Sequence, residues 1–198
     1  MFKHTISYKI ISKNYSKLYS PSFMLIKTIF LDRDGVINKE VNYLHKIADF
    51  EFINGVFEAC QHFQRLNYKI IIITNQSGIS RGFYTKNDYE LMSKWMVSQF
   101  KKNDVKILDI FSCHHGPLSQ CKCRKPKPGM LISADEKYKI DMANSWMIGD
   151  KESDIKAANN AGIDNTILVK SGHTFHKSKS NAKFIINSIK NSVSVITK

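Results

Sequence analysis

The chain has 198 residues, of which 42% are apolar, and this size and composition suit one globular domain with a full core. None of its apolar runs approaches the roughly 18 to 20 residues of a membrane span, which excludes a membrane-spanning helix. A net charge of +13 can indicate a polyanionic partner, but here the charge is concentrated at the two ends of the chain. Ten of the thirty basic residues lie in residues 1–24 and 170–198, which hold no acidic residue. We therefore interpret the basic ends as solvated tails or faces and expect no nucleic-acid partner.

Residues 1–24 contain no long apolar stretch and no small-residue cleavage site, so they lack the pattern of a secretory signal. We interpret them as a basic extension, which is either flexible or lies upstream of a natural start at Met24. Residues 25–198 are predicted to form a single domain. Because it has no signal and no exposed apolar stripe, we expect it to be cytoplasmic and monomeric.

Strand-like apolar runs alternate with helical patterns along this domain. In chain order we predict a strand over 25–31, a helix over 55–66, a strand over 69–73, a helix from a Thr85 cap to about Gln99, a strand over 107–111, a helix from Pro128 to Tyr138, a strand over 146–148, a helix from a Ser153 cap to about Gly162, a strand over 166–169, and a strand over 184–186 followed by a short helix. This alternation predicts an α/β fold: a doubly wound, mainly parallel sheet with helices on both faces.

Two carboxylates stand directly after the first predicted strand, in the segment Asp32-Arg33-Asp34-Gly35. In open α/β sheets, ligands bind outside the carboxyl ends of the strands. A carboxylate there can attack phosphorus while its neighbour moves protons, and both favour a bound Mg²⁺. Taken alone, the tetrapeptide is equally consistent with a strand-end turn capped by aspartate.

The next three strand ends carry further polar groups. Thr74-Asn75-Gln76-Ser77-Gly78 supplies hydroxyl, amide and backbone donors suited to phosphate oxygens, Arg124-Lys125 follows the third strand, and Gly149-Asp150-Lys151 follows the fourth. Parallel strands bring these groups to one edge of the sheet. Phosphoryl transfer requires such a set: a nucleophile, cations and donors for the phosphoryl oxygens, and carboxylates for Mg²⁺.

The four segments resemble, in order, the motifs of the haloacid dehalogenase superfamily of phosphatases. The first motif, D-x-D-G, matches 32–35, and the other three match Thr74, Lys125 and Asp150. The similarity extends over about residues 25–169, which is most of the chain outside its basic ends.

This resemblance implies a role for each motif residue. Asp32 would attack phosphorus and form an aspartyl-phosphate, and Asp34 would protonate the leaving oxygen and then deprotonate the hydrolytic water. Thr74 and Lys125 would hold the transferred group. Asp32, the backbone carbonyl of Asp34, and Asp150 would bind a catalytic Mg²⁺.

Three charged neighbours of these motifs are further candidates. Arg33 and Lys151 are either surface charges or supply the positive charge that a phosphate and two carboxylates need, which favours a supporting or substrate-binding role. By resemblance, Asp154 supports the metal shell rather than contacting the metal.

Three of the four cysteines lie in the segment 113–123, which we interpret as a zinc loop, while Cys60 is a predicted core residue. The candidate zinc ligands are Cys113, His115, Cys121 and Cys123. Three thiolates and one imidazole suit a structural, tetrahedral zinc site. His114 is the competing imidazole, and a disulfide is an alternative that the odd cysteine count and the lack of a signal disfavour. Because the loop runs into the cations at 124 and 125, its expected role is to fix them in place of a large cap domain.

Within the superfamily, a Cys-His loop followed by C-R-K-P resembles two bacterial groups, the D-glycero-D-manno-heptose 1,7-bisphosphate 7-phosphatases and the histidinol-phosphate phosphatases. Segments 32–38, 50–56, 74–82 and 127–131 look more like the heptose enzymes, whereas histidinol-phosphate phosphatases share the short spacer between His115 and Cys121. The heptose resemblance implies that residues 40–43 line the sugar side and that the product feeds nucleotide-activated heptose synthesis for lipopolysaccharide. The substrate contacts it implies are Asn42, Tyr43, Asn75, Gln76, Ser77 and Arg124, the last for the second phosphate.

Two interpretations from other classes stay open. One is a nucleic-acid 3′-phosphatase, which only the basic ends support. The other is a catalytically silent, zinc-stabilised binding domain, which the complete set of motif residues disfavours.

Overall fold

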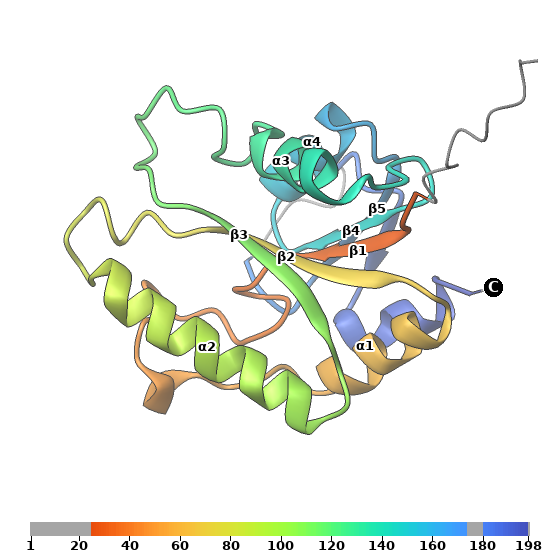
Figure 1. Cartoon of the computed structure of the whole chain (residues 1–198), viewed down its shortest axis with the longest axis horizontal. Helices are drawn as coiled ribbons and strands as arrows, with labels where there is room; N and C mark the ends of the chain where they lie inside the picture. The colour runs from red at the N-terminus through yellow and green to blue at the C-terminus, as the bar shows by residue number, and fades with distance from the viewer. Residues whose placement is uncertain (1–24, 174–179, 198) are drawn as a thin grey trace, which may run out of the picture.

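A single sheet of six strands forms the centre of the computed structural model, which describes residues 25–173 and 180–197 (Figure 1). The strand order is β3-β2-β1-β4-β5-β6, and every neighbouring pair is parallel. The strands are β1 (Thr28–Leu31), β2 (Lys69–Asn75), β3 (Ile107–Cys113), β4 (Trp146–Gly149), β5 (Asn165–Val169) and β6 (Phe184–Ile186). This sheet confirms the predicted fold class, whereas the predicted extension 1–24 lies outside the described residues.

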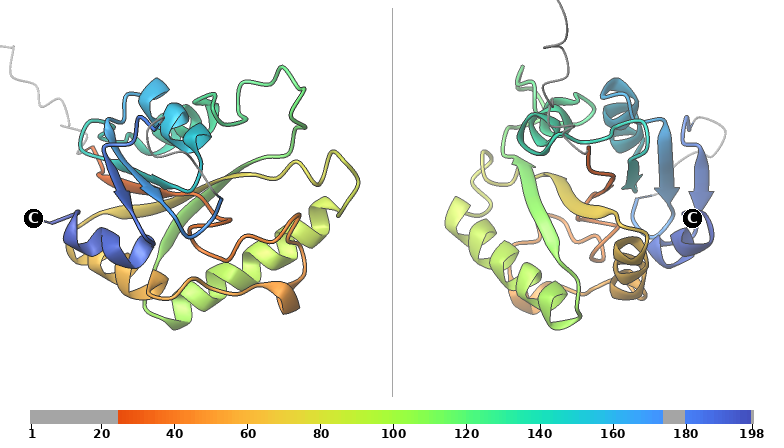
Figure 2. Two further views of the ribbon diagram at one scale, coloured as in Figure 1. Left: turned by 180° about the vertical axis from the view of Figure 1, so that it is seen from behind. Right: turned by 45° about the vertical axis from the view of Figure 1, so that its right-hand side comes forward.

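Helices cover both faces of the sheet. They are α1 (Val56–Arg65), α2 (Lys86–Lys102), α3 (Gly129–Tyr138) and α4 (Glu152–Asn160), with 3-10 segments η1 (Ile47–Asp49) and η3 (Ile189–Ser194). Figure 1 shows α3 and α4 on one side of the sheet and α1 and α2 on the other, and the views in Figure 2 place the C-terminal segment beside α1. No helix of the described segments has the length and apolarity needed to cross a membrane.

The central strand β1 illustrates why the sheet is covered on both faces. Ile29 and Leu31 point into the core shared with α1 and α2, whereas Phe30 points into the core shared with α3 and α4. All three side chains are fully buried. Successive side chains of a strand point to opposite faces, so a continuous apolar run requires packing on both sides.

Several boundaries differ from the predicted ones. β1 begins at Thr28 rather than residue 25, because Thr28 is the first residue that pairs with β2, opposite Lys69. Ile26, before it, makes only an isolated bridge to Ile140. The prediction that Ser153 caps α4 is wrong: Lys151 is the N-cap residue, and its backbone N–H donates to Asp154 Oδ2 at 3.0 Å. An acidic side chain in the first turn therefore satisfies the free amide of the N-cap residue.

Other elements are longer or start later than predicted. β2 and β3 continue to the pair Asn75 and Cys113, so a candidate phosphate-binding residue and a candidate zinc ligand are held in the ladder itself. Helix α2 continues to Lys102, which carries the buried Phe100 into the core. Pro128 is the N-cap residue of α3 rather than part of its first turn, and the predicted C-terminal helix is the 3-10 segment η3.

The strand order places a ligand-binding crevice at the carboxyl end of β1. From β1 the chain builds the sheet in one direction through β2 and β3, and later in the other direction through β4, β5 and β6. The loops after β1 and β4 therefore leave the sheet on opposite sides and open a gap between them. Ligands of doubly wound proteins bind at this point of reversal.

Candidate active site

A cavity of about 330 Å³ opens at the carboxyl ends of β1, β2 and β4. The predicted site residues that line it are Asp32, Arg33, Asp34, Asn42, Tyr43, Asn75, Gln76, Ser77, Arg124, Lys125 and Lys151. Thr74 and Asp150 are almost fully buried directly behind this lining. The fold thus brings residues from five separate segments of the chain to one place.

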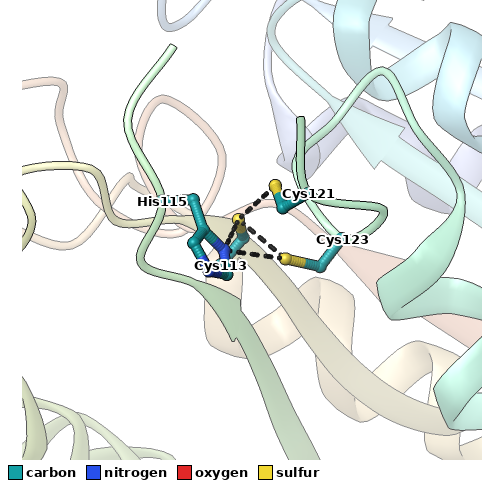
Figure 3. A group of neighbouring side chains, drawn as sticks. All are labelled: Cys113, His115, Cys121 and Cys123. Atoms are coloured by element: carbon teal, nitrogen blue, oxygen red, sulfur yellow. Dashed lines mark hydrogen bonds between the residues drawn. The ribbon is translucent and has the colours of Figure 1, made fainter. Parts of the chain in front are cut away.

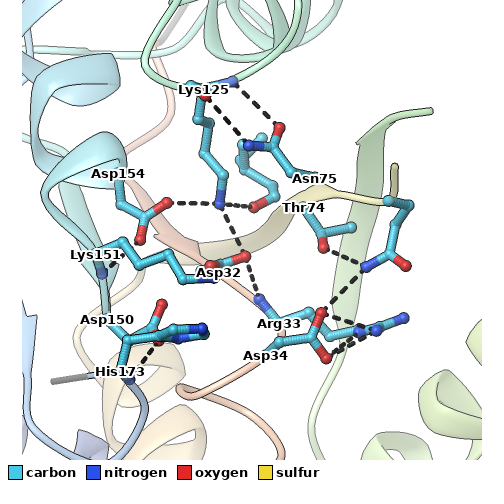
Figure 4. A network of polar contacts seen from close by, with 12 residues as sticks. Asp32, Arg33, Asp34, Thr74, Asn75, Lys125, Asp150, Lys151, Asp154 and His173 are labelled. Carbon is cyan, nitrogen blue, oxygen red and sulfur yellow. Dashed lines mark hydrogen bonds and ion pairs between the residues drawn. The ribbon is translucent and has the colours of Figure 1, made fainter. Parts of the chain in front are cut away.

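Lys125 is buried between two carboxylates at the bottom of this cavity (Figure 4). Its Nζ lies 2.8 Å from Asp32 Oδ1 and 2.7 Å from Asp154 Oδ1, and it donates to the carbonyl oxygen of Ile73 at 2.8 Å. Burial alone would lower the pKa of Lys125, but Asp154 and Asp32 raise it by more. The ammonium group is therefore charged throughout the physiological pH range.

Asp32 is held in one orientation by two donors. The backbone N–H of Arg33 donates to Asp32 Oδ1 at 2.7 Å, and Lys125 contacts the same oxygen. Within residues 25–173 and 180–197, no hydrogen bond reaches Oδ2, which leaves that oxygen available for a reaction or for a metal. Burial raises the pKa of Asp32 to about 6, against the opposing effect of Lys125.

Asp34 lies in a fork of donors. The Arg33 guanidinium contacts it from Nη2 at 2.7 and 2.8 Å and from Nε at 3.0 Å, and amide groups of Asn38 and Gln76 donate at 3.0 and 3.2 Å. Arg33 is only 2% exposed, so it is not a surface charge. Its guanidinium supports Asp34 with the bidentate geometry that arginine makes to carboxylates.

The polar residues at the end of β2 hold one another. Gln76 Nε2 donates to Thr74 Oγ1 at 2.7 Å, and Tyr84 Oη donates to Gln76 Oε1 at 2.6 Å. The side-chain amide of Asn75 is paired with the backbone N–H and carbonyl of Lys125, at 3.2 and 3.3 Å. Asn75 lines the cavity and also holds the segment that carries Lys125.

The residues around Asp32 fit a magnesium ion. Carboxylate oxygens of Asp32, Asp150 and Asp154 lie within 4.8 Å of one another. Asp150 is fully buried, and its Oδ1 has no hydrogen-bond partner in the described structure. An orphaned buried carboxylate oxygen beside a second carboxylate is the hard oxygen donor set that Mg²⁺ prefers. Asp154 is already engaged by Lys125 and the Lys151 amide, so it is suited to support the ion rather than to bind it.

The four predicted zinc ligands also converge (Figure 3). Cys113 Sγ lies 3.8 Å from Cys121 Sγ and 3.0 Å from Cys123 Sγ, and His115 Nδ1 lies 3.5 and 3.3 Å from Cys113 and Cys123. Ligands at about 2.3 Å from a tetrahedral zinc ion lie roughly 3.8 Å apart, so the cluster has nearly the required size. His114 contacts Ser112 Oγ instead and is not part of the cluster.

The chain is similar to known phosphatases. The family model described as HAD-hydrolase-like matches residues 122–192. The D-glycero-alpha-D-manno-heptose-1,7-bisphosphate 7-phosphatase of Photorhabdus laumondii is 51% identical over 164 residues, covering 79% of this chain and 90% of the relative. The chain belongs to the heptose-bisphosphate 7-phosphatase family.

Two further comparisons agree with this family. The D-glycero-beta-D-manno-heptose-1,7-bisphosphate 7-phosphatase of Vibrio cholerae is 46% identical over 73% of this chain and 81% of its own length. The solved structure of the D,D-heptose 1,7-bisphosphate phosphatase of B. bronchiseptica, complexed with magnesium and phosphate, matches with a TM-score of 0.76 at 26% identity, covering 86% of this chain and 97% of that one. These matches confirm the predicted superfamily, and the protein is a phosphoric monoester hydrolase.

Aromatic contacts that the sequence did not predict lie beside the cavity of this phosphatase, around its lining residues Tyr43 and Tyr84. The Tyr43 ring lies 4.2 Å from Phe83, and the Arg81 guanidinium stacks on both rings while donating to Tyr43 Oη. His45 stacks on Tyr84 at 5.3 Å. These pairs join residues 39–46 to 77–84, and nothing in either segment alone signals the pairing.

Two titratable residues lie at the cavity, of which Glu40 was predicted only within the segment 40–43 and His173 was not predicted. Glu40 is partly buried, and burial together with Asp34 raises its pKa to about 7. His173, beyond the end of β5, contacts Asp150 through Nδ1 at 2.6 Å. A single histidine in a polar segment carries no motif, so only the fold could reveal this contact.

Proposed function

We propose that this phosphatase removes the 7-phosphate of D-glycero-D-manno-heptose 1,7-bisphosphate in a Mg²⁺-dependent reaction. The observation that carries the substrate is the 51% identity with a relative of that name over 90% of its length. The observation that carries the chemistry is the buried arrangement of Asp32, Lys125 and Asp154 beside the orphaned oxygen of Asp150.

The proposed reaction has two displacements at phosphorus. A carboxylate oxygen of Asp32 attacks the 7-phosphorus, the bond from phosphorus to the sugar oxygen breaks, and Asp34 gives that oxygen a proton. An aspartyl-phosphate remains on Asp32. Asp34 then takes a proton from water, the water oxygen attacks phosphorus, and the bond to Asp32 breaks to release inorganic phosphate and restore the carboxylate.

The surrounding residues supply positive charge and donors to the transferred group. Lys125 Nζ lies 2.8 Å from Asp32 Oδ1 and so supplies a cation beside a phosphoryl group formed on Asp32. Because Thr74 Oγ1 accepts a hydrogen bond from Gln76, its own hydroxyl hydrogen is free to donate to a phosphoryl oxygen. Mg²⁺ held by Asp32, Asp150 and the carbonyl oxygen of Asp34 would neutralise charge on the phosphoryl oxygens.

The rest of the substrate lies toward the cavity mouth in this proposal. Asn42, Tyr43 and Ser77 line the sugar side, and Lys151 and Arg124 supply cations. Arg124 Nη1 donates to the carbonyl oxygen of His115 at 3.2 Å, so the zinc loop directs a guanidinium toward the second phosphate. Arg33, Asn75 and Gln76 also line the cavity, and in this proposal they support Asp34, Lys125 and Thr74 through hydrogen bonds.

Release of inorganic phosphate in the presence of Mg²⁺ tests the substrate. We expect a strong preference for heptose 1,7-bisphosphate over histidinol phosphate and over an oligonucleotide with a 3′-phosphate, with both anomers of the heptose assayed because the relatives are named for either. A preference for histidinol phosphate would be consistent with the proposed mechanism and would contradict the proposed substrate. Activity on none of them, with zinc bound and the fold intact, would favour a silent binding domain.

We further propose that the cysteine and histidine cluster holds a structural zinc ion that positions the catalytic lysine. The loop is tied to the segment after it, since Lys127 Nζ donates to the carbonyl oxygen of Cys121 at 2.7 Å. Gly129 packs so closely that a Cβ there would lie 2.4 Å from the carbonyl oxygen of Lys122. Displacement of the loop would therefore move Lys125.

Removal of zinc is accordingly expected to lower both the melting temperature and kcat. Elemental analysis should find one zinc per chain, and Cys121→Ser should lose it. The matched control is Cys60→Ser, a core cysteine outside the loop, which should keep its zinc. A zinc-free protein with unchanged melting temperature and activity would contradict the proposal.

The proposed pathway rests on the chemistry of the product. A heptose that keeps its 1-phosphate suits transfer onto a nucleotide, and we propose a place in the synthesis of nucleotide-activated heptose for lipopolysaccharide. The proposed enzyme is a cytoplasmic monomer, which gel filtration with light scattering would test.

A further inference from the structure

The segment Ser171-Gly172-His173 follows β5, and His173 lines the cavity. Ser171 Oγ donates to the carbonyl oxygen of Gly35 at 2.8 Å. Both the backbone N–H and the imidazole Nδ1 of His173 contact Asp150 Oδ2, at 2.9 and 2.6 Å. The segment therefore touches the loops after β1 and β4 together, although the sequence carries no motif there.

Two glycines pack closely against the Asp150 carboxylate. A Cβ on Gly172 would lie 2.2 Å from Asp150 Oδ2, and one on Gly35, whose φ is +85°, would lie 2.4 Å from the same oxygen. Two glycines and two donors thus enclose Oδ2. Oδ1, by contrast, has no partner within the described residues.

We propose that the His173 imidazole is a positioning residue for the magnesium site: by occupying Asp150 Oδ2, it directs Oδ1 toward the ion. This inference rests on the proposed Mg²⁺ dependence. A carboxylate that accepts a single hydrogen bond can still rotate. When two donors hold one of its oxygens, the second oxygen points in a fixed direction. Groups that hydrogen-bond to a metal ligand set its orientation, and their loss lowers metal affinity by about 10- to 100-fold.

The tautomer of His173 follows from this contact. Because a carboxylate oxygen only accepts, Nδ1 must carry the hydrogen, and the donor required is an N–H at the Nδ1 position. The side-chain amide of asparagine places an N–H near that position, and phenylalanine fills the space without one. The carboxylate oxygen Oε2 of Glu40 also lies near this side of the ring, at 3.7 Å from Nδ1.

Titration of the full-length protein with Mn²⁺, followed by the electron paramagnetic resonance signal of the free ion, tests this role without relying on turnover. Mn²⁺ shares the preference of Mg²⁺ for oxygen ligands. We expect His173→Phe to weaken Mn²⁺ binding by about tenfold or more, and His173→Asn to stay within about threefold of the unchanged protein. The concentration of Mg²⁺ for half-maximal activity should rise in parallel, with most of kcat recovered at saturating Mg²⁺.

His62→Phe is the matched control, because His62 lies on α1 and bonds the carbonyl oxygen of Ile196 away from the cavity. It should bind Mn²⁺ as the unchanged protein does. Equal affinity in His173→Phe and the unchanged protein, together with loss of binding in Asp150→Asn, would overturn the inference while leaving the metal site in place. Absence of Mn²⁺ binding in the unchanged protein would instead overturn the proposed metal site itself.

Discussion

Replacing Asp32 with asparagine is expected to lower kcat by about a thousandfold or more while leaving the fold intact, as loss of a covalent nucleophile does in other enzymes. The amide is nearly the same size as the carboxylate and keeps an oxygen for the backbone N–H of Arg33. It is a poor nucleophile and lacks the negative charge that a magnesium ligand needs. Steady-state release of phosphate from heptose 1,7-bisphosphate measures the loss.

Rapid acid quenching with a substrate labelled in its 7-phosphate distinguishes the proposed mechanism from direct attack by water. The unchanged enzyme should retain label on protein in a form that hydroxylamine releases, because hydroxylamine cleaves acyl phosphates, and Asp32→Asn should retain none. Asp109→Asn is the matched control: Asp109 lies on the edge strand β3 and contacts Lys137 and Tyr138. Substantial turnover by Asp32→Asn would refute the assignment of the nucleophile.

Replacing Lys125 with methionine is expected to affect both stability and activity. The side chain is nine-tenths or more buried, and its removal leaves Asp32 and Asp154 close together without their shared cation. Breaking a buried ion pair by deleting one partner costs roughly 3 to 5 kcal/mol of unfolding free energy. Activity should fall with it, because a phosphoryl group on Asp32 loses its nearest cation.

A double variant separates the two consequences. Asp154→Asn removes one of the two stranded charges, so Lys125→Met/Asp154→Asn should regain part of the stability in urea unfolding but none of the activity. The coupling between the two positions, obtained from the double-mutant cycle, reports their interaction. Recovery of activity in the double variant would show that the lysine acts only on the fold, contrary to the proposed contact with phosphate.

Local patterns sufficed to predict most secondary structure. The isoleucine run of β2 and the Thr85 capping box of α2 are short-range signals, and both elements form where they were expected, although each continues further. The errors lay at the ends of strands and helices, where the boundary depends on contacts with other residues. The start of β1 depends on Lys69, and the cap of α4 depends on the side chain of Asp154.

The candidate site was predicted in its parts but not in its connections. Motifs after four strands placed the reactive residues at one sheet edge, and the cavity contains or adjoins them all. The roles of the residues next to these motifs were harder to predict from the sequence. Arg33 was an open choice between a surface charge and a supporting or substrate-binding role, and the prediction that Asn75 contacts the substrate did not include the bonds of its amide to the Lys125 backbone.

The sequence by itself determined the fold class, the order of the strands along the chain, and the chemical types that meet at their ends, because these depend on periodicity, turns and residue identity. Only the tertiary structure decided which oxygen of Asp32 and Asp150 is free, how Lys125 is shared, and that His173 reaches Asp150 from 23 residues away. Such contacts join residues distant along the chain, and their geometry is set by the packing of the whole sheet. No local pattern encodes them.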